Sequence, residues 1–166
     1  MPNISNAPLV SIVIPMYNEG NYIKSTLRSI HRQTYDNVQL ILVDDCSSDN
    51  TLELAQSNIR SSDIILKNST NMGQQFSMNR GAMHADGEYI VFHDADDLST
   101  QDRIEKQVKF LENNERVGVV GGAYFYVNPE REEPKIKTRP TGDTQIRDGM
   151  IRECMINAGT AMYRRK

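Results

Sequence analysis

Apolar segments rich in Val and Ile alternate along the chain with segments whose apolar residues recur every three or four positions. The first kind predicts buried strands and the second predicts amphipathic helices. This alternation predicts one α/β domain with a doubly wound, mostly parallel sheet flanked by helices. Strands are expected at residues 9–15, 38–43, 63–67, 88–92, 117–122, 123–127 and 159–163.

The segments between these strands predict helices with one apolar face toward the sheet. The fourth helix follows Ser99–Asp102, which resembles a capping box with Asp in place of Glu. A short helix is expected over residues 145–154, after a polar excursion from Asn128 to Asp143. The residues expected to face the core are Ile23, Leu27 and Ile30, then Leu52, Ala55 and Ile59, then Phe76 and Met83, and finally Ile104, Val108 and Leu111.

Composition narrows the class of protein. The chain has 166 residues, 38% of them hydrophobic and 25% charged, which fits one globular domain with its own core. The formal net charge of -3 gives no basic footprint and argues against a nucleic-acid partner. Cys46 and Cys154 form no C-x-x-C pair and predict reduced, buried thiols. The sequence shows neither a signal peptide nor a run of about 20 apolar residues, so we expect no membrane span.

Carboxylates are crowded directly after the apolar segment at residues 88–92. Asp94, Asp96 and Asp97 lie within four positions, at the expected carboxyl end of a buried strand. Such neighbours repel one another and raise each other's pKa unless a cation joins them. Asp-Ala-Asp therefore predicts a site for Mg²⁺ or Mn²⁺, with phosphate oxygens completing the shell. Asp97 and Ser99 are better interpreted as part of a helix cap.

A second acidic strand end strengthens this hypothesis. Right-handed crossovers place the carboxyl ends of the first, second and fourth strands on one edge of the sheet. That arrangement brings Tyr17, Asp45 and the pair Asp94 and Asp96 together around a crevice. Like charges gathered there would lower stability without a ligand, so the crevice is expected to bind a nucleotide and a metal ion.

At this point several segments resemble family 2 glycosyltransferases of the GT-A fold. The resemblance covers residues 9–125 best, and it is specific because the motifs occur in the family's order. It implies a GT-A nucleotide-sugar-binding domain over residues 1–166, with an incomplete acceptor side at residues 126–166. The matching segments are Val10–Glu19, Val43–Asp49, the two N-x-G segments Asn71–Gly73 and Asn79–Gly81, Ala85–Ile90 and Asp94–Asp96.

The resemblance implies roles at the nucleoside end of the donor. Pro15 and Tyr17 would line the pocket for the base and ribose. Glu19 would lie near the ribose, or would simply begin a helix. Asp45 would accept a hydrogen bond from a uracil-type ring, whereas Asp44 would be structural.

The resemblance also implies roles at the diphosphate and sugar end. Asn71 and Asn79 would orient the donor, although both could instead cap backbone groups. Asp94 would approach the ribose or sugar and assist the metal, with Ala95 beside it. Asp96 would coordinate the Mg²⁺ or Mn²⁺ ion that bridges the diphosphate.

Two departures from the family pattern bear on function. Met78 stands where the family commonly has an arginine, and the nearby Arg80 is a candidate substitute for that charge. Family members also usually continue to a carboxylate, often in an E-D pair, that serves as the catalytic base. We therefore expect the base beyond Lys166, and we expect this chain to bind donor without transferring sugar efficiently.

The reaction implied is inverting, metal-dependent transfer of a sugar from a nucleoside diphosphate donor, a UDP-sugar, to an acceptor hydroxyl. The acceptor could be a saccharide, a lipid or a protein. One alternative is a non-catalytic nucleotide-sugar-binding module. A sugar-nucleotide pyrophosphorylase is disfavoured, because residues 15–20 lack the glycine-rich, basic loop that would hold a triphosphate. We expect a cytoplasmic domain, with the inner face of the membrane as one place where it could act.

Overall fold

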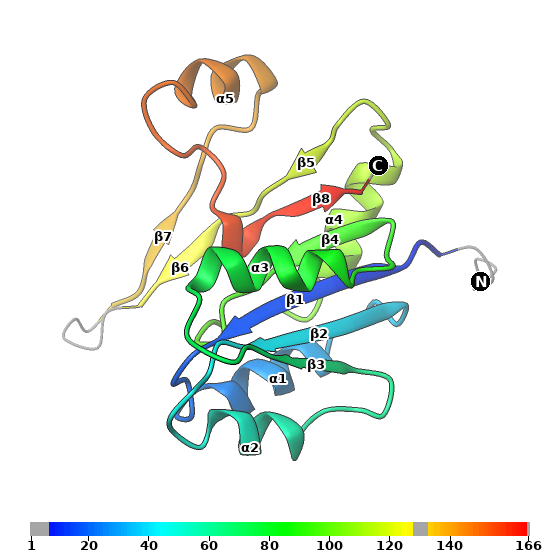
Figure 1. Ribbon diagram of the computed structural model, residues 1–166. Coiled ribbons are helices and arrows are strands. Elements are labelled where there is room, and N and C mark those ends of the chain that lie inside the picture. Colours follow the sequence, from blue (N-terminus) through cyan, green and yellow to red (C-terminus); the bar gives the residue numbers. More distant parts are fainter. Residues whose placement is uncertain (1–6, 128–132, 166) are drawn as a thin grey trace.

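The computed structural model describes residues 7–127 and 133–165. In that part of the chain a six-stranded sheet lies at the centre, with its strands in the order β3-β2-β1-β4-β8-β5 (Figure 1). The strands are β1 (Val10–Met16), β2 (Val38–Asp44), β3 (Ile64–Lys67), β4 (Tyr89–Phe92), β5 (Val119–Val120) and β8 (Met162–Arg164).

Strands β3, β2, β1 and β4 are parallel, so their carboxyl ends meet at one edge of the sheet. β1 lies in the middle, with Val10 opposite Val38 on one side and opposite Tyr89 on the other. Every residue of β1 is buried, as expected of a strand covered on both faces. β8 runs antiparallel to its neighbours β4 and β5. The predicted α/β class and mostly parallel sheet are confirmed.

Helices cover both faces of the sheet (Figure 1). α1 (Ile23–His31), α2 (Thr51–Gln56) and α4 (Arg103–Glu112) pack on one face, in an apolar cluster with alternate residues of β1, β2 and β4. α3 (Gln74–Met83) packs on the other face, against β1 and β2. The core predicted for the first, second and fourth helices is confirmed, because one apolar cluster includes or contacts Ile23, Leu27, Ile30, Leu52, Ala55, Ile59, Ile104, Val108 and Leu111.

The predicted inward face of α3 is wrong. Phe76 and Met83 were expected in the core, but their exposed fractions are 46% and 85%. The buried face of the helix instead includes Met78 and Gly81. A Cβ on Gly81 would lie 2.3 Å from Cγ1 of Val13, so the glycine lets α3 approach the sheet closely. A pattern of large apolar residues does not reveal a contact made by a glycine.

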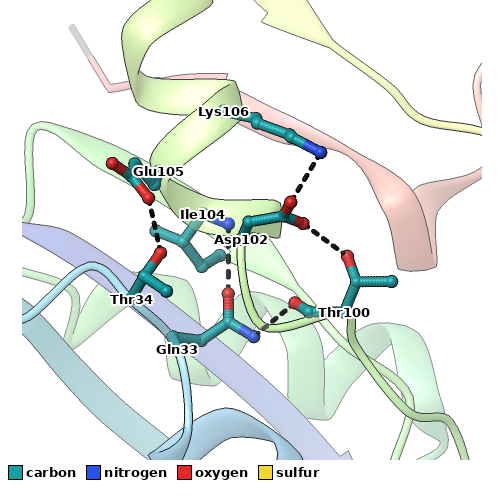
Figure 2. Close-up of polar contacts among 7 residues, drawn as sticks. All are labelled: Gln33, Thr34, Thr100, Asp102, Ile104, Glu105 and Lys106. Carbon is teal, nitrogen blue, oxygen red and sulfur yellow. Dashed lines mark hydrogen bonds and ion pairs between the residues drawn. The ribbon is translucent and has the colours of Figure 1, made fainter.

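The first turn of α4 is capped by a side chain that follows α1 (Figure 2). Oε1 of Gln33 accepts the amide of Ile104 at 3.1 Å, and Nε2 of Gln33 donates to the carbonyl of Thr100 at 2.7 Å. Oγ1 of Thr34 donates to Glu105 at 2.6 Å beside this pair. Gln33 is buried, so these bonds fix the loop before α4 against α1.

The capping box predicted at Ser99–Asp102 is wrong. The helix begins later, at Arg103, and Asp102 makes no side-chain bond to the first amides. The carboxylate of Asp102 accepts from Oγ1 of Thr100 at 3.1 Å and pairs with Lys106 at 2.6 Å. The Ile104 amide in the first turn of α4 donates instead to Gln33, which is distant in sequence, and a local motif cannot indicate such a partner.

The C-terminal part departs most from the expected elements. β6 (Tyr124–Tyr126) pairs with β7 (Lys135–Lys137) in a separate two-stranded sheet, and not with the central one. The helix expected at residues 145–154 is α5 (Asp143–Gly149), and the first half of the expected last strand is the 3₁₀ helix η2 (Ala158–Thr160). Within the excursion expected from Asn128 to Asp143, residues 128–132 lie outside the described part of the chain.

Composition-based expectations have mixed outcomes. The thiols predicted to be buried are not, because Cys46 is partly exposed and Cys154 is exposed; both are free. Over residues 7–127 and 133–165, the helices lack the length and apolar character needed to cross a membrane. Residues 1–6, where a signal peptide was judged absent, lie outside that range.

Candidate functional site

A cavity of about 460 Å³ lies at the carboxyl ends of β1, β2 and β4. The loops that follow these strands and the start of α3 form its walls. In open α/β sheets this edge is where ligands bind. The residues lining the cavity are Pro15, Met16, Tyr17, Glu19, Asp45, Asn71, Gly73, Gln74, Asp94, Ala95 and Asp96.

The structure brings together the residues suggested as donor-binding, with one exception. Asn79 lies on the exposed surface of α3 and is not part of the cavity lining. Met16, Gly73 and Gln74 line the cavity although the sequence did not single them out. Gly73 ends the N-x-G segment that begins at Asn71, so that motif did mark the right turn.

Two loops are joined beside the cavity, one after β1 and one after β2. Asn18 has a positive φ of 57°, and its Oδ1 accepts the amide of Ser48 at 2.8 Å. The Asn18 amide donates to Oγ of Ser47 at 3.1 Å, and the Gly20 amide donates to Asp49 at 3.1 Å. These bonds fix the neighbours of Asn18, including Tyr17, next to the end of β2.

The carboxylate of Asp45 holds the loop that leads into α3, which forms another wall of the cavity. Its Oδ1 accepts from Nδ2 of Asn68 at 2.6 Å and from the amide of Met72 at 2.8 Å. Its Oδ2 accepts the amide of Gly73 at 2.8 Å, where the chain turns with a φ of 88°. Burial would raise the pKa of Asp45, but the hydrogen bonds led by the one from Met72 outweigh burial and lower the pKa. Asp45 therefore stays ionised and holds the loop that leads into α3.

Arg80 supports this anchor and does not face the cavity. Its Nη1 donates to the carbonyl of Lys67 at 2.8 Å and also to Oδ1 of Asn68. Asn68 in turn donates to Asp45, so the guanidinium orients the amide that holds the carboxylate. Met78 is buried against the sheet. Arg80 therefore does not replace, inside the cavity, the arginine that the family pattern places at position 78.

Burial and the repulsion between neighbouring acids both raise carboxyl pKa values on the opposite wall of the cavity. Burial raises the pKa of Asp94, and the charge of Asp96 raises it further. Burial also raises the pKa of Glu19, followed by the charges of Asp96, Asp49 and Asp94. Oδ1 of Asp94 accepts one bond, from Nε2 of Gln74 at 2.9 Å. A cation between these groups would relieve the repulsion.

The donor set fits a hard divalent ion. Asp94 and Asp96 offer carboxylate oxygens to the same cavity, which leaves space beside them. Among the described residues, no three His, Cys, Asp or Glu side chains form a ready-made metal cage. Mg²⁺ suits such a site, because it is usually held by one or two carboxylates together with substrate phosphates and water. Asp97 is exposed, and its amide donates to the carbonyl of Asp94 at 3.3 Å, so it belongs to the turn.

Comparison with known proteins identifies the family. The profile described as glycosyl transferase family 2 matches residues 11–166. The chain belongs to this family. An uncharacterized glycosyltransferase of Haemophilus influenzae is 37% identical over 136 residues, which cover 80% of this chain and 54% of that protein. The chain thus spans about half the length of this relative.

Two solved structures share the fold. S. aureus TarS 1–349 in complex with UDP-GlcNAc has a TM-score of 0.63 and 26% identity, over 67% of this chain and 33% of that one. The mannosyltransferase PcManGT of Pyrobaculum calidifontis, in complex with GDP-Man and Mn²⁺, has a TM-score of 0.70 and 22% identity, over 99% of this chain and 47% of that one. The expected GT-A fold is confirmed by these neighbours.

Proposed function

We propose that this family 2 glycosyltransferase transfers a sugar from a UDP-sugar to an acceptor hydroxyl, with inversion and with Mg²⁺ or Mn²⁺ as cofactor. The observation that carries the proposal is that Tyr17, Asp45, Asp94 and Asp96 line one and the same cavity. Its place at the carboxyl edge of a GT-A sheet supports a nucleotide-sugar ligand. The structural likeness to TarS, which was solved with UDP-GlcNAc, supports a uridine nucleotide.

The nucleoside end of the donor is assigned to the β1 and β2 side of the cavity. Tyr17 is 45% exposed and offers a ring face on which a base can stack. Oδ1 of Asp45 already accepts two bonds, whereas Oδ2 accepts one from Gly73. Asp45 lines the cavity, and Oδ2 is assigned to accept the ring N–H of uracil. Pro15, Glu19 and Asn71 complete this side of the pocket.

The diphosphate end explains why a metal ion is part of the proposal. The lining residues include Glu19, Asp94 and Asp96 but no Lys or Arg, within the part of the chain that the structure describes. An anionic diphosphate would be repelled by these acids alone. A bound divalent ion supplies positive charge that joins the carboxylates to the phosphates and stabilises the leaving diphosphate. Asp96 and Asp94 are assigned as its protein ligands.

Transfer also needs a group that removes the acceptor proton, which contributes about 10²–10⁴-fold in rate. Asp94 and Asp96 are poor candidates, because a bound cation lowers the pKa of a carboxylate and weakens it as a base. Asp45 is equally unsuited, because its hydrogen bonds lower its pKa. The base is therefore assigned to a group other than these three. A saccharide, lipid or protein hydroxyl remains the proposed class of acceptor.

The test is release of uridine diphosphate from UDP-sugars in a single-turnover assay, with Mn²⁺ or chelator and with saccharide acceptors present or absent. The proposal expects release that depends on both metal and acceptor. Binding of UDP-sugar without any release would instead support a non-catalytic module. Synthesis of a UDP-sugar from UTP and a sugar phosphate would support a pyrophosphorylase, although the loop at residues 15–20 lacks lysine and arginine.

A further inference from the structure

A buried guanidinium lies behind the acidic wall of the cavity. Arg103 begins α4, and its Nη2 is buried without a hydrogen-bond partner among the described residues. Burial lowers the pKa of Arg103, and the charges of Asp97 and Asp94 offset part of that shift. Arg103 is not part of the cavity lining, so it would not touch a donor directly. Its hydrogen bonds go to Ser99 and Gln107, and each of these residues begins a path toward Asp94.

The first set of bonds leads to the main chain of Asp94. Nη1 of Arg103 donates to Oγ of Ser99 at 3.0 Å, and Oγ of Ser99 lies 2.9 Å from Nε2 of His93. Nδ1 of His93 lies 2.7 Å from the carbonyl of Asp94, which can only accept, so Nδ1 carries the proton. Nε2 then accepts from the Ser99 hydroxyl, and every donor points toward Asp94.

The imidazole in this path is neutral. His93 is 2% exposed, and each ring nitrogen has one hydrogen-bond partner, the carbonyl of Asp94 for Nδ1 and Oγ of Ser99 for Nε2. A neutral ring has one donor and one acceptor, which matches its two partners. Arg103, Ser99 and His93 therefore form a continuous hydrogen-bonded path with one consistent direction.

The second set of bonds leads to the segment that contacts the carboxylate of Asp94. Nε of Arg103 donates to Oε1 of Gln107 at 3.3 Å, and Nε2 of Gln107 donates to the carbonyl of Thr160 at 2.8 Å. Thr160 ends η2, and its neighbour Gly159 lies against Asp94, where a Cβ would be 2.8 Å from Oδ2. This path thus fixes the surface on which the carboxylate rests.

We propose that Arg103 is a positioning residue for the metal and diphosphate site, because it fixes Asp94 from both sides. Its first path holds the carbonyl of Asp94, and its second path holds η2 against the carboxylate. The inference rests on the proposed function, in which Asp94 and Asp96 hold the metal ion. Outer residues that orient metal ligands typically account for about 10–100-fold in metal affinity or activity.

The main variant is Arg103→Met, which keeps the apolar stem and removes the guanidinium. Calorimetry of uridine diphosphate with Mn²⁺ and with chelator should show the metal-dependent gain in affinity reduced by about 10–100-fold. Binding in chelator should be unchanged, because the nucleoside end of the cavity is untouched. Arg103→Lys should behave like Arg103→Met, because a single ammonium group cannot donate to both Ser99 and Gln107 as the forked guanidinium does.

The control is Lys106→Met on the same helix, where the side chain is 74% exposed and pairs only with Asp102 among the described residues. It should bind like the wild type. Ser99→Ala and Gln107→Met interrupt one path each and should each remove part of the metal-dependent gain. In the Arg103→Met background neither should have much further effect, because residues of one network are not additive. If Arg103→Met does not fold, these two variants decide the question.

A second measurement separates this inference from the proposed function. Amide resonances of the metal-free protein should shift at Asp94–Asp97 and Gly159 in Arg103→Met but not in Lys106→Met. A folded Arg103→Met variant with unchanged resonances there, or with the full metal-dependent gain, would overturn the positioning role. If the wild type shows no metal-dependent gain but the resonances shift, the metal proposal fails while Arg103 still positions Asp94.

Discussion

Gly159 lies against the carboxylate of Asp94 so closely that a Cβ on the glycine would be 2.8 Å from Oδ2. The two residues are distant in sequence, and they meet because β8 returns beside β4. One wall of the cavity at the carboxyl ends of β1, β2 and β4 therefore depends on the segment before β8. The missing side chain at position 159 sets how far the carboxylate can move.

Gly159→Ala should displace Asp94 and weaken metal-dependent nucleotide binding. Overpacking of this kind costs roughly 1–3 kcal/mol, which here would be divided between fold stability and binding. Gly122→Ala is the matched control, because a Cβ at Gly122 meets nothing within 4 Å. Calorimetry with uridine diphosphate and Mn²⁺ measures the effect. Equal affinities for the two variants would show that the contact leaves Asp94 free to adjust.

Asp96→Asn should remove most of the metal dependence of nucleotide binding while leaving the fold intact, because Asp96 is exposed. It also removes a charge that raises the pKa of Asp94 and Glu19, so the metal-free variant should melt no lower than the wild type at neutral pH. Asp36→Asn, at the opposite end of β2, serves as the control. Identical binding in Mn²⁺ and in chelator for the wild type would exclude the metal role.

Asp45→Asn should lower the free energy of unfolding by about 1–3 kcal/mol at neutral pH, because the donors on Met72 and Gly73 lose a charged acceptor. The pKa of Asp45 is lowered in the folded state, so its stabilisation is complete above the ordinary value of 3.8. The stabilisation is lost as the pH falls through the lower folded-state value. Urea unfolding across this range should show the difference from wild type shrinking toward acid; a constant difference would refute the assignment.

The same variant tests base recognition. If Oδ2 of Asp45 accepts the ring N–H of uracil, Asp45→Asn should weaken uridine diphosphate by about 1.5–3 kcal/mol and flatten the preference among bases. Affinities for the diphosphates of uridine, cytidine, adenosine and guanosine measure this. An equal loss for all four would mean that Asp45 only holds the loop at Met72 and Gly73.

Gln33→Met should destabilise the protein by about 0.5–2 kcal/mol, the range for loss of a helix cap. The amide of Ile104 and the carbonyl of Thr100 lose their partner, and both are held by Gln33 from another element. Gln75→Met, on the exposed surface of α3, controls for the change in side chain. Urea denaturation gives both values. A variant as stable as the control would show that water replaces the cap.

The sequence predicted the elements whose signals are local. β1 is apolar except for Ser11 and is buried throughout, and the α1 stripe at Ile23, Leu27 and Ile30 faces the core. The cavity was also predictable, since parallel strands put Asp45 and Asp94 at one edge. These residues are neighbours because of topology, and the alternation of strands and helices fixes that topology.

What the sequence could not predict depends on contacts between distant segments. α3 approaches the sheet at Gly81, where no larger side chain would fit. With that side of the helix turned inward, Phe76 points to solvent. Asn79 carries a family motif but lies outside the cavity lining, whereas Gln74, with no motif of its own, reaches Asp94. Which side of α3 faces the sheet decides where Asn79 and Gln74 lie. The hydrophobic pattern of this helix is too weak to predict that side.

The position of β8 between β4 and β5 has a consequence for biosynthesis. In the described chain, β5 pairs only with β8, which lies about 40 residues later in the sequence. During synthesis on the ribosome, β1 to β4 can assemble first. The β5 segment then has no strand to pair with until β8 emerges. Domains fold as units from the N-terminus during synthesis, and an unpaired strand edge is the exposed state from which aggregation begins. Co-translational proteolysis should therefore cut near β5 until β8 has emerged from the ribosome.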